Sequence, residues 1–275
     1  MKKRIFKMIV LGIKQMSDPY YQGFAAQMAF YMILAMVPVI IVLSQILGLF
    51  NISMSFFNKY IDHYVSADVS GILKQLFSYK PAAANNLVMI VTALWAASKA
   101  QLPMLRISNY TYTAGKYTSK GFFRERARSV FCMIGIIFTV TFTMVVLVYG
   151  KALLSLSLGR IDLGGYVDTL WTYLRWPLTI VLFFLMISIN YYILPSEKIK
   201  FREIVPGSVL CSIGMLAVTI GYSAYTGYVA NYDIIYGSLA SIVAMLFWLF
   251  FLAEILCLGV IFNKVWADSQ SLVKG

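Results

Sequence analysis

Six long runs of apolar residues divide the chain, and each is long enough to cross a lipid bilayer as a helix. A hydrocarbon core about 30 Å thick takes roughly 20 mostly apolar residues in an α-helix. Backbone polar groups cannot stay unpaired in lipid, and the ten-residue alternation of a membrane barrel is absent, so we predict that the runs are helices. The predicted spans are residues 24–50, 87–105, 129–150, 170–194, 206–229 and 237–263.

Two segments outside the spans carry helical periodicity of their own. In residues 51–86 we predict two short amphipathic helices on the outer surface, because apolar residues repeat there at helical spacing. They would form a structural lid or, alternatively, cap a cavity or touch acyl chains. In residues 1–20 we predict an interfacial helix on the inner leaflet, since Lys7 interrupts the apolar part of what would otherwise resemble a signal peptide. The whole chain, 1–275, is thus predicted to be one all-α integral membrane domain, a polytopic helix bundle.

Composition supports a membrane protein, and the distribution of charge along the chain predicts its orientation in the membrane. Hydrophobic residues make up 60% of the chain and charged residues 12%, and the formal net charge is +12. When the six spans are threaded with the N-terminus inside, the inner segments hold sixteen basic and five acidic residues, whereas the outer segments hold five of each. The basic excess therefore predicts cytoplasmic N- and C-termini. Membrane lipids are the expected partners of these cations, and no motif indicates specific nucleic-acid binding.

Cysteine and histidine content argues against several kinds of site. Cys132, Cys211 and Cys257 each fall inside an apolar run without paired spacing, which predicts neither a disulfide framework nor a thiolate metal site. His63 is the only histidine, so histidine clusters and histidine-based zinc motifs are excluded. We expect no metal, no cofactor and no catalytic residue.

Several residues inside or near the spans predict local features. Pro38 and Pro103 should kink the first and second helices, since proline removes a backbone hydrogen bond. Arg175 lies between Trp171 and Trp176 near the outer end of the fourth span, where we predict interface anchors.

Small residues four positions apart would let helix backbones approach closely. Two such pairs are Ala25 with Ala29 and Ala217 with Gly221. They are typical of a packed bundle and permit a homo-oligomer.

Lys99 and Glu254 are the ionisable residues that lie deepest in the predicted spans. Both spans run from outside to inside, and the two residues lie about 18 and 25 Å from the outer ends at a rise of about 1.5 Å per residue. We predict that they interact inside the bundle, directly or through water, in a site for substrate binding or proton coupling. Alternatively, Lys99 extends to the head groups and Glu254 is protonated and hydrogen-bonded in the core. Other polar residues that could line this interior, or merely bond helix to helix, are Gln22, Gln27, Gln45, Ser98, Gln101 and Asn190.

Four stretches of the chain resemble the YihY/BrkB family of bacterial inner-membrane proteins. They are AAQMAFYMILAMVPVIIVLSQILG, LWAASKAQLPMLRISNYTY, LPSEKIKFREIVPGSVL and NYDIIYGSLASIVAMLFWLFFLAEILCLGVIFN. The resemblance implies six membrane helices and an inner-membrane location. Lys99 fits the basic residue typical of the family at that point. Gly259 and Asn263 match the family's last-span pattern, but Ile261 stands at its acidic position, so that acid's role does not transfer to Glu254.

The resemblance also bears on function. Family-level proposals lean towards transport or export, including of lipids, and the sequence shows no nuclease constellation behind the family's earlier ribonuclease annotation. Our leading hypothesis is a transporter or flippase for an anionic or amphipathic, lipid-like substrate. The alternative is a non-catalytic membrane scaffold that organises partners of the cell envelope.

Overall fold

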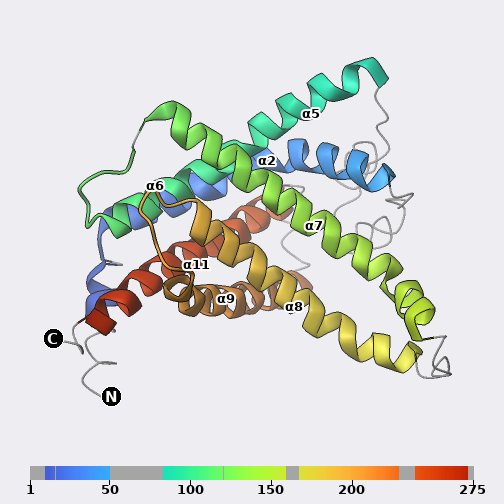
Figure 1. Ribbon diagram of the computed structural model, residues 1–275. Helices are drawn as coiled ribbons and strands as arrows, with labels where there is room; N and C mark the ends of the chain where they lie inside the picture. Colours follow the sequence, from blue (N-terminus) through green and yellow to red (C-terminus); the bar gives the residue numbers. More distant parts are fainter. Residues whose placement is uncertain are drawn as a thin grey trace.

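The computed structural model is built from helices that run its length (Figure 1). It describes residues 10–15, 17–49, 83–119, 121–158, 167–228 and 239–271. The helices are α2 (Pro19–Leu49), α5 (Ala83–Ala97), a short 3₁₀ helix η1 (Ser98–Ala100), α6 (Gln101–Tyr112), α7 (Phe122–Leu158), α8 (Val167–Ile193), α9 (Phe201–Tyr228) and α11 (Leu239–Ser271).

Within these residues, six helical segments are long and apolar enough to cross a membrane. They are Pro19–Gly48, Val88–Tyr112, Phe122–Val146, Thr169–Ile193, Phe201–Tyr225 and Val243–Gln270. The predicted all-α fold with six membrane helices is confirmed. The predicted outer helices of 51–86 fall almost wholly on residues outside the described part, as do residues 1–9 of the predicted interfacial helix and His63.

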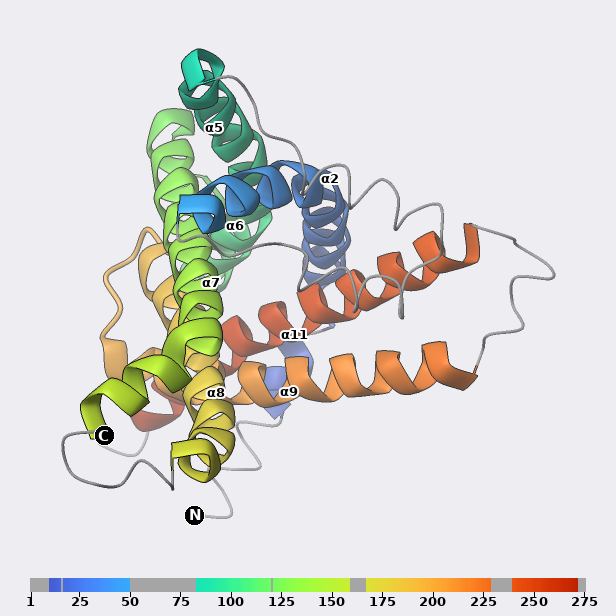
Figure 2. The same ribbon diagram turned by 90° about the vertical axis from the view of Figure 1, so that its right-hand side faces the viewer.

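The beginning of α2 and the end of α11 lie at the same end of the molecule, which we call the proximal end (Figure 1). From it the helices spread towards the opposite, distal end as three pairs: α2 with α5, α7 with α8, and α9 with α11 (Figure 2). Helix α2, which contains Pro38, also changes direction along its length in this view. Helix α11 packs against α2 and α6 and so joins its own pair to α2 with α5, while α8 packs against α9 and joins α7 with α8 to the same pair.

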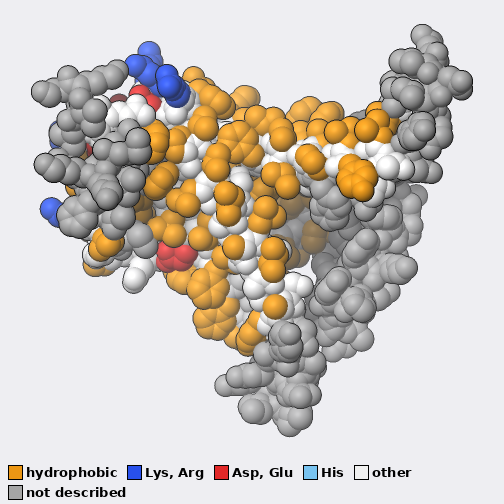
Figure 3. Space-filling view, turned by 90° about the horizontal axis from the view of Figure 1, so that it is seen from below, with side chains coloured by type: hydrophobic (Ala, Val, Ile, Leu, Met, Phe, Trp, Pro, Cys, Tyr) orange, Lys and Arg blue, Asp and Glu red, His pale blue; other side chains and the backbone are white. Residues whose placement is uncertain are grey.

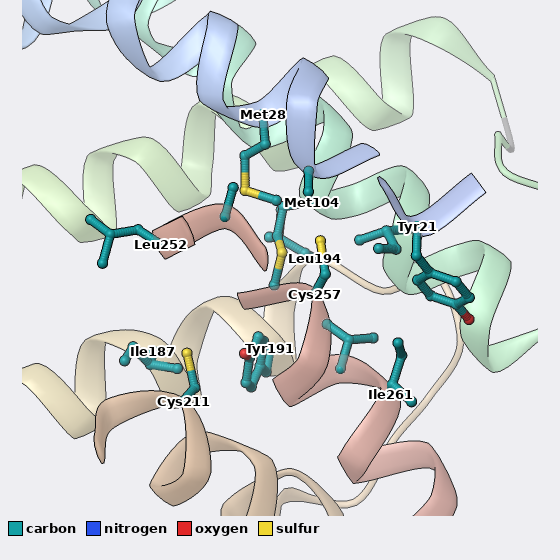
Figure 4. Packing of buried hydrophobic residues seen from close by; sticks show 14 of the residues in the cluster. Tyr21, Met28, Met104, Ile187, Tyr191, Leu194, Cys211, Leu252, Cys257 and Ile261 are labelled. Atoms are coloured by element: carbon teal, nitrogen blue, oxygen red, sulfur yellow. The ribbon is translucent and has the colours of Figure 1, made fainter. Parts of the chain in front are cut away.

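The main core lies where these helices converge. Met28 of α2, Met104 of α6 and Cys257 of α11 are all at most 3% exposed and lie together in Figure 4. Long, flexible methionine side chains fill the irregular space between helices that cross at different angles. A second cluster, which includes Val42, Ala97 and Met133, fills the space between α2, α5 and α7.

Polar side chains tie the proximal end together. Asn109 of α6 is fully buried; its amide donates to the Thr118 carbonyl at 3.0 Å, and its carbonyl oxygen accepts from the Ser196 backbone at 2.8 Å. Tyr110 donates to the Asp18 carboxylate at 2.5 Å. One asparagine therefore satisfies backbone groups of the α6–α7 and α8–α9 connections, which holds the three helical pairs in one arrangement.

Helices α9 and α11 approach one another at two glycines. The Gly207 backbone N–H of α9 donates to the buried Asn263 side chain of α11 at 2.6 Å, and a Cβ on Gly207 would collide with the Gly259 carbonyl. A Cβ on Gly259 would in turn collide with the Tyr191 hydroxyl, which donates to the Leu256 carbonyl at 2.9 Å. Both positions therefore require glycine because of backbone proximity.

Candidate functional site

Glu254 lies in a groove between the first part of α2 and the middle of α11. The groove has a volume of about 440 Å³, within the range of roughly 300–1,000 Å³ typical of small-molecule sites. It is lined by Tyr21, Gln22, Phe250, Phe251, Glu254, Cys257, Leu258 and Ile261. We call this space the Glu254 groove.

The Glu254 carboxylate is half-buried and has no hydrogen bond or ion pair with another described residue. It lies eleven residues after Val243 and sixteen before Gln270, the two ends of the candidate span, and is therefore well inside that span. An acidic group at such a depth is a functional candidate because it is costly to place there.

A second cavity, the aromatic pocket, adjoins the Glu254 groove along α11. It has a volume of about 420 Å³ between α9 and α11. Its lining residues are Val218, Gly221, Tyr222, Tyr225, Ala244, Phe247, Trp248 and Phe251. The Tyr222 and Trp248 rings are stacked with centroids 5.4 Å apart. A third cavity, of about 510 Å³ between α2, α5 and α7, is lined by apolar side chains and the Thr141 hydroxyl. Among the described residues, the polar chemistry of the cavities therefore gathers along α11.

The second span is broken at Lys99. Its α-helical backbone changes to the 3₁₀ segment Ser98–Ala100 and resumes at Gln101. Pro103 is the physical cause, because a proline ring clashes with the carbonyl four residues earlier, here that of Lys99. A 3₁₀ turn inside a helix is often a hinge or a functional position. The break leaves the Lys99 side chain exposed.

Arg126 of α7 covers this break, which the sequence did not predict. Its side chain is buried at 4% exposure; the guanidinium donates to the Trp95 carbonyl and lies 4.1 Å from the centre of the Trp95 ring. In the sequence, Arg126 falls between the second and third predicted spans, among the basic residues of an inner segment. The available signal was the buried face of the third span, since Cys132 and Ser129 lead back at helical spacing to Arg126.

Lys99 and Glu254 do not form a direct ion pair, which was one of the two forms of the predicted interaction. Neither side chain makes a hydrogen bond or salt bridge to the other in the described part of the chain, and Lys99 does not line the Glu254 groove. Counting residues gave their depths but not the direction in which each helix turns its side chains. The exposed position of Lys99 agrees with the alternative in which it extends away from the core.

We therefore expect Lys99→Ala and Glu254→Ala to act independently. Residues without shared partners usually give changes that add within about 0.3–0.5 kcal/mol. The measurement is a double-mutant cycle on the apparent unfolding midpoint in detergent. A double variant markedly more stable than the sum of the single changes would restore the predicted pair.

Of the other polar residues predicted to line the interior, Gln22 lines the groove, whereas Gln27 and Asn190 do not. Gln27 is half-buried on α2, and Asn190 is 9% exposed on α8, where its amide donates to the Met186 carbonyl at 2.8 Å. Trp171 packs over Gly150 of α7. The side chains of Arg175 and Trp176 belong to the part of α8 that is not described, so their predicted anchoring role stays a prediction. None of the described residues form a group of three or more His, Cys, Asp or Glu that could hold a metal ion.

Comparison with known proteins identifies the family of this chain. The family model described as virulence factor BrkB matches residues 13–273, which is nearly the whole chain. The chain belongs to the virulence factor BrkB family. This confirms the family resemblance, and with the six candidate spans it makes the protein a multi-pass membrane protein.

Relatives of this chain differ in how much of their length they share with it. The ribonuclease-like protein YfkH of Bacillus subtilis is 24% identical over 86% of this chain and 87% of its own length. A UPF0761 membrane protein of Chromobacterium violaceum is 34% identical over 31% of this chain and 21% of its own. One from Coxiella burnetii is 29% identical over 34% of this chain and 36% of its own. No solved structure matches the chain.

Proposed function

We propose that this BrkB family protein is a transporter or flippase that moves an amphipathic, lipid-like substrate across the bacterial inner membrane. The observation that carries the proposal is the Glu254 groove, because it places an acidic group among apolar walls near the middle of the span. A lipid crossing the bilayer needs a polar surface for its head group at the depth where the hydrocarbon offers none. Apolar walls suit its acyl chains at the same time.

The charge of the groove selects between the two substrate classes expected from the sequence. Among the described residues that line it, Glu254 is the only charged one, and none is a lysine or arginine. An ionised carboxylate repels an anion in a medium of low dielectric constant. The groove therefore favours an amphipathic substrate over a simple anion. The proposal includes no catalytic step.

A substitution that fills the groove tests this function independently of charge. Vesicles containing the protein should expose an inner-leaflet, acyl-labelled fluorescent phospholipid to an external quencher about tenfold faster than protein-free vesicles, which corresponds to a barrier lowered by about 1.4 kcal/mol. Leu258→Trp, which enlarges a lining side chain, should return the rate to that of protein-free vesicles. Phe262→Trp, on the same helix outside the groove, is the matched control. Equal rates with and without protein would favour the scaffold alternative.

We also propose that the proximal end faces the cytoplasm. Lysine and arginine side chains gather at that end in Figure 3, while the rest of the face shown is mostly hydrophobic. An excess of basic residues marks the cytoplasmic side of membrane proteins.

Cysteine labelling tests this orientation, because Cys132, Cys211 and Cys257 are all buried and should stay silent. Lys116→Cys, at an exposed position between α6 and α7, should react with a membrane-impermeant maleimide only after the cell membrane is permeabilised. Labelling of intact cells would place this end outside.

A further inference from the structure

The Glu254 groove and the aromatic pocket are neighbouring cavities along α11, and we call the two together the path. Phe251 lines both cavities, with the aromatic pocket towards the distal end of the helix and Glu254 towards its middle. A head group held between α9 and α11 would therefore lie beside the Glu254 groove. Their combined lining provides aromatic rings first and a carboxylate next.

The aromatic rings and the Glu254 carboxylate of this path attract a positive charge. The faces of tyrosine, tryptophan and phenylalanine rings carry negative electrostatic potential and bind ammonium groups, as in aromatic cages. The aromatic pocket contains Tyr222, Tyr225, Phe247, Trp248 and Phe251. Glu254 adds a carboxylate without an ion-pair partner, and no lysine or arginine lines either cavity, within the part of the chain that the structure describes.

We propose that the path recognises a phospholipid whose head group carries a primary ammonium, an inference that rests on the proposed transport function. The ammonium would contact the rings of the aromatic pocket and then the Glu254 carboxylate. The side-chain amide of Gln22, which forms no hydrogen bond with another described residue, can donate to the phosphate beside it. The apolar remainder of the walls identifies the occupant as a lipid and not a free amine.

The sharpest test compares lipids that differ only in the ammonium charge. The probes are acyl-labelled phosphatidylethanolamine, the same lipid acetylated on its amine, and acyl-labelled phosphatidylglycerol, each in vesicles containing the full chain. We expect phosphatidylethanolamine to move about tenfold faster than the other two, the ratio that corresponds to about 1.4 kcal/mol. Equal rates for all three would overturn the ammonium assignment and leave the transport function standing.

Two variants connect this preference to the path. Glu254→Gln keeps the side-chain shape but removes the charge, so the phosphatidylethanolamine rate should fall to that of its acetylated form, while the acetylated form is unchanged. Trp248→Leu should reduce the preference about threefold, as expected for the loss of one cation–π contact. The matched controls are Glu203→Gln on α9 and Trp266→Leu on α11, neither of which lines the path. If both path variants keep the full preference, the assignment is wrong.

The case in which no probe moves is also decisive. The proposed function then fails, and binding to the purified protein in detergent decides the ammonium inference separately. Tighter binding of phosphatidylethanolamine than of its acetylated form, lost in Glu254→Gln, supports a lipid site without transport. Equal binding of the two lipids overturns it.

Discussion

Replacing Gly207 with alanine should lower the apparent unfolding midpoint by about 6–12 °C, which corresponds to about 3 kcal/mol for a domain of this size. The added Cβ would collide with the Gly259 carbonyl and with Asn263. The Gly259 carbonyl is backbone, and the Asn263 side chain is buried and accepts the Gly207 N–H, so α9 and α11 must separate. The separation would also lengthen the bond from the Gly207 N–H to Asn263. The measurement is thermal unfolding of the purified protein in detergent.

The same helix provides the matched control for Gly207. A Cβ on Gly221 would meet nothing within 4 Å. Gly221→Ala should therefore keep the midpoint or raise it slightly, because alanine is favoured over glycine in a helix by up to about 1 kcal/mol. If both substitutions had the same effect, the close contact of α9 with α11 would not be the reason for glycine at position 207.

Arg126→Ala should be the other strongly destabilising change, by about 3 kcal/mol. A hydrogen bond from a charged donor contributes about 1.5–3 kcal/mol, and a cation–π contact about 0.5–2 kcal/mol. Removal of the guanidinium eliminates both its hydrogen bond to the Trp95 carbonyl and its cation–π contact with the Trp95 ring. The nearby Arg124, whose side chain is exposed, is the control, and Arg124→Ala should change the midpoint little.

A double-mutant cycle separates the two contributions of Arg126. Trp95→Ala removes the ring but keeps the backbone carbonyl, so it eliminates the cation–π contact alone. The coupling between Arg126→Ala and Trp95→Ala should then be about 1 kcal/mol, smaller than the full effect of Arg126→Ala. An Arg126→Ala protein as stable as Arg124→Ala would show that the guanidinium does not support the break at Ser98–Ala100.

Helix packing shows where sequence patterns were insufficient. Ala25 and Ala29 are buried in the main core, as their four-residue spacing predicts, but Ala217 and Gly221 are exposed. The close approach in α9 occurs instead at Gly207, seven residues before Gly214, whose added Cβ would come 2.8 Å from Ile255. Spacing shows that a face has small residues, whereas only the partner helix decides whether that face is used.

The helix bounds differ for a related reason. The third span was predicted to begin at residue 129, but α7 begins at Phe122 and includes Glu125 and Arg126. Their charges are typical of a loop outside the membrane, which is why hydropathy placed the beginning of the third span too late in the sequence. Both are buried because α7 packs against α6 and α5 there, and Glu125 lies 3.9 Å from Arg106.

The sequence by itself determined the six membrane helices and the family, and it placed Glu254 inside the sixth helix, because transfer into lipid depends on local composition. Only the tertiary structure decided that Lys99 and Glu254 do not pair, that Arg126 supports the broken second span, and that Glu254 adjoins an aromatic pocket. These features depend on the rotation of each helix about its axis and on its neighbours. Both are fixed by contacts between residues far apart in the chain, which no local pattern contains.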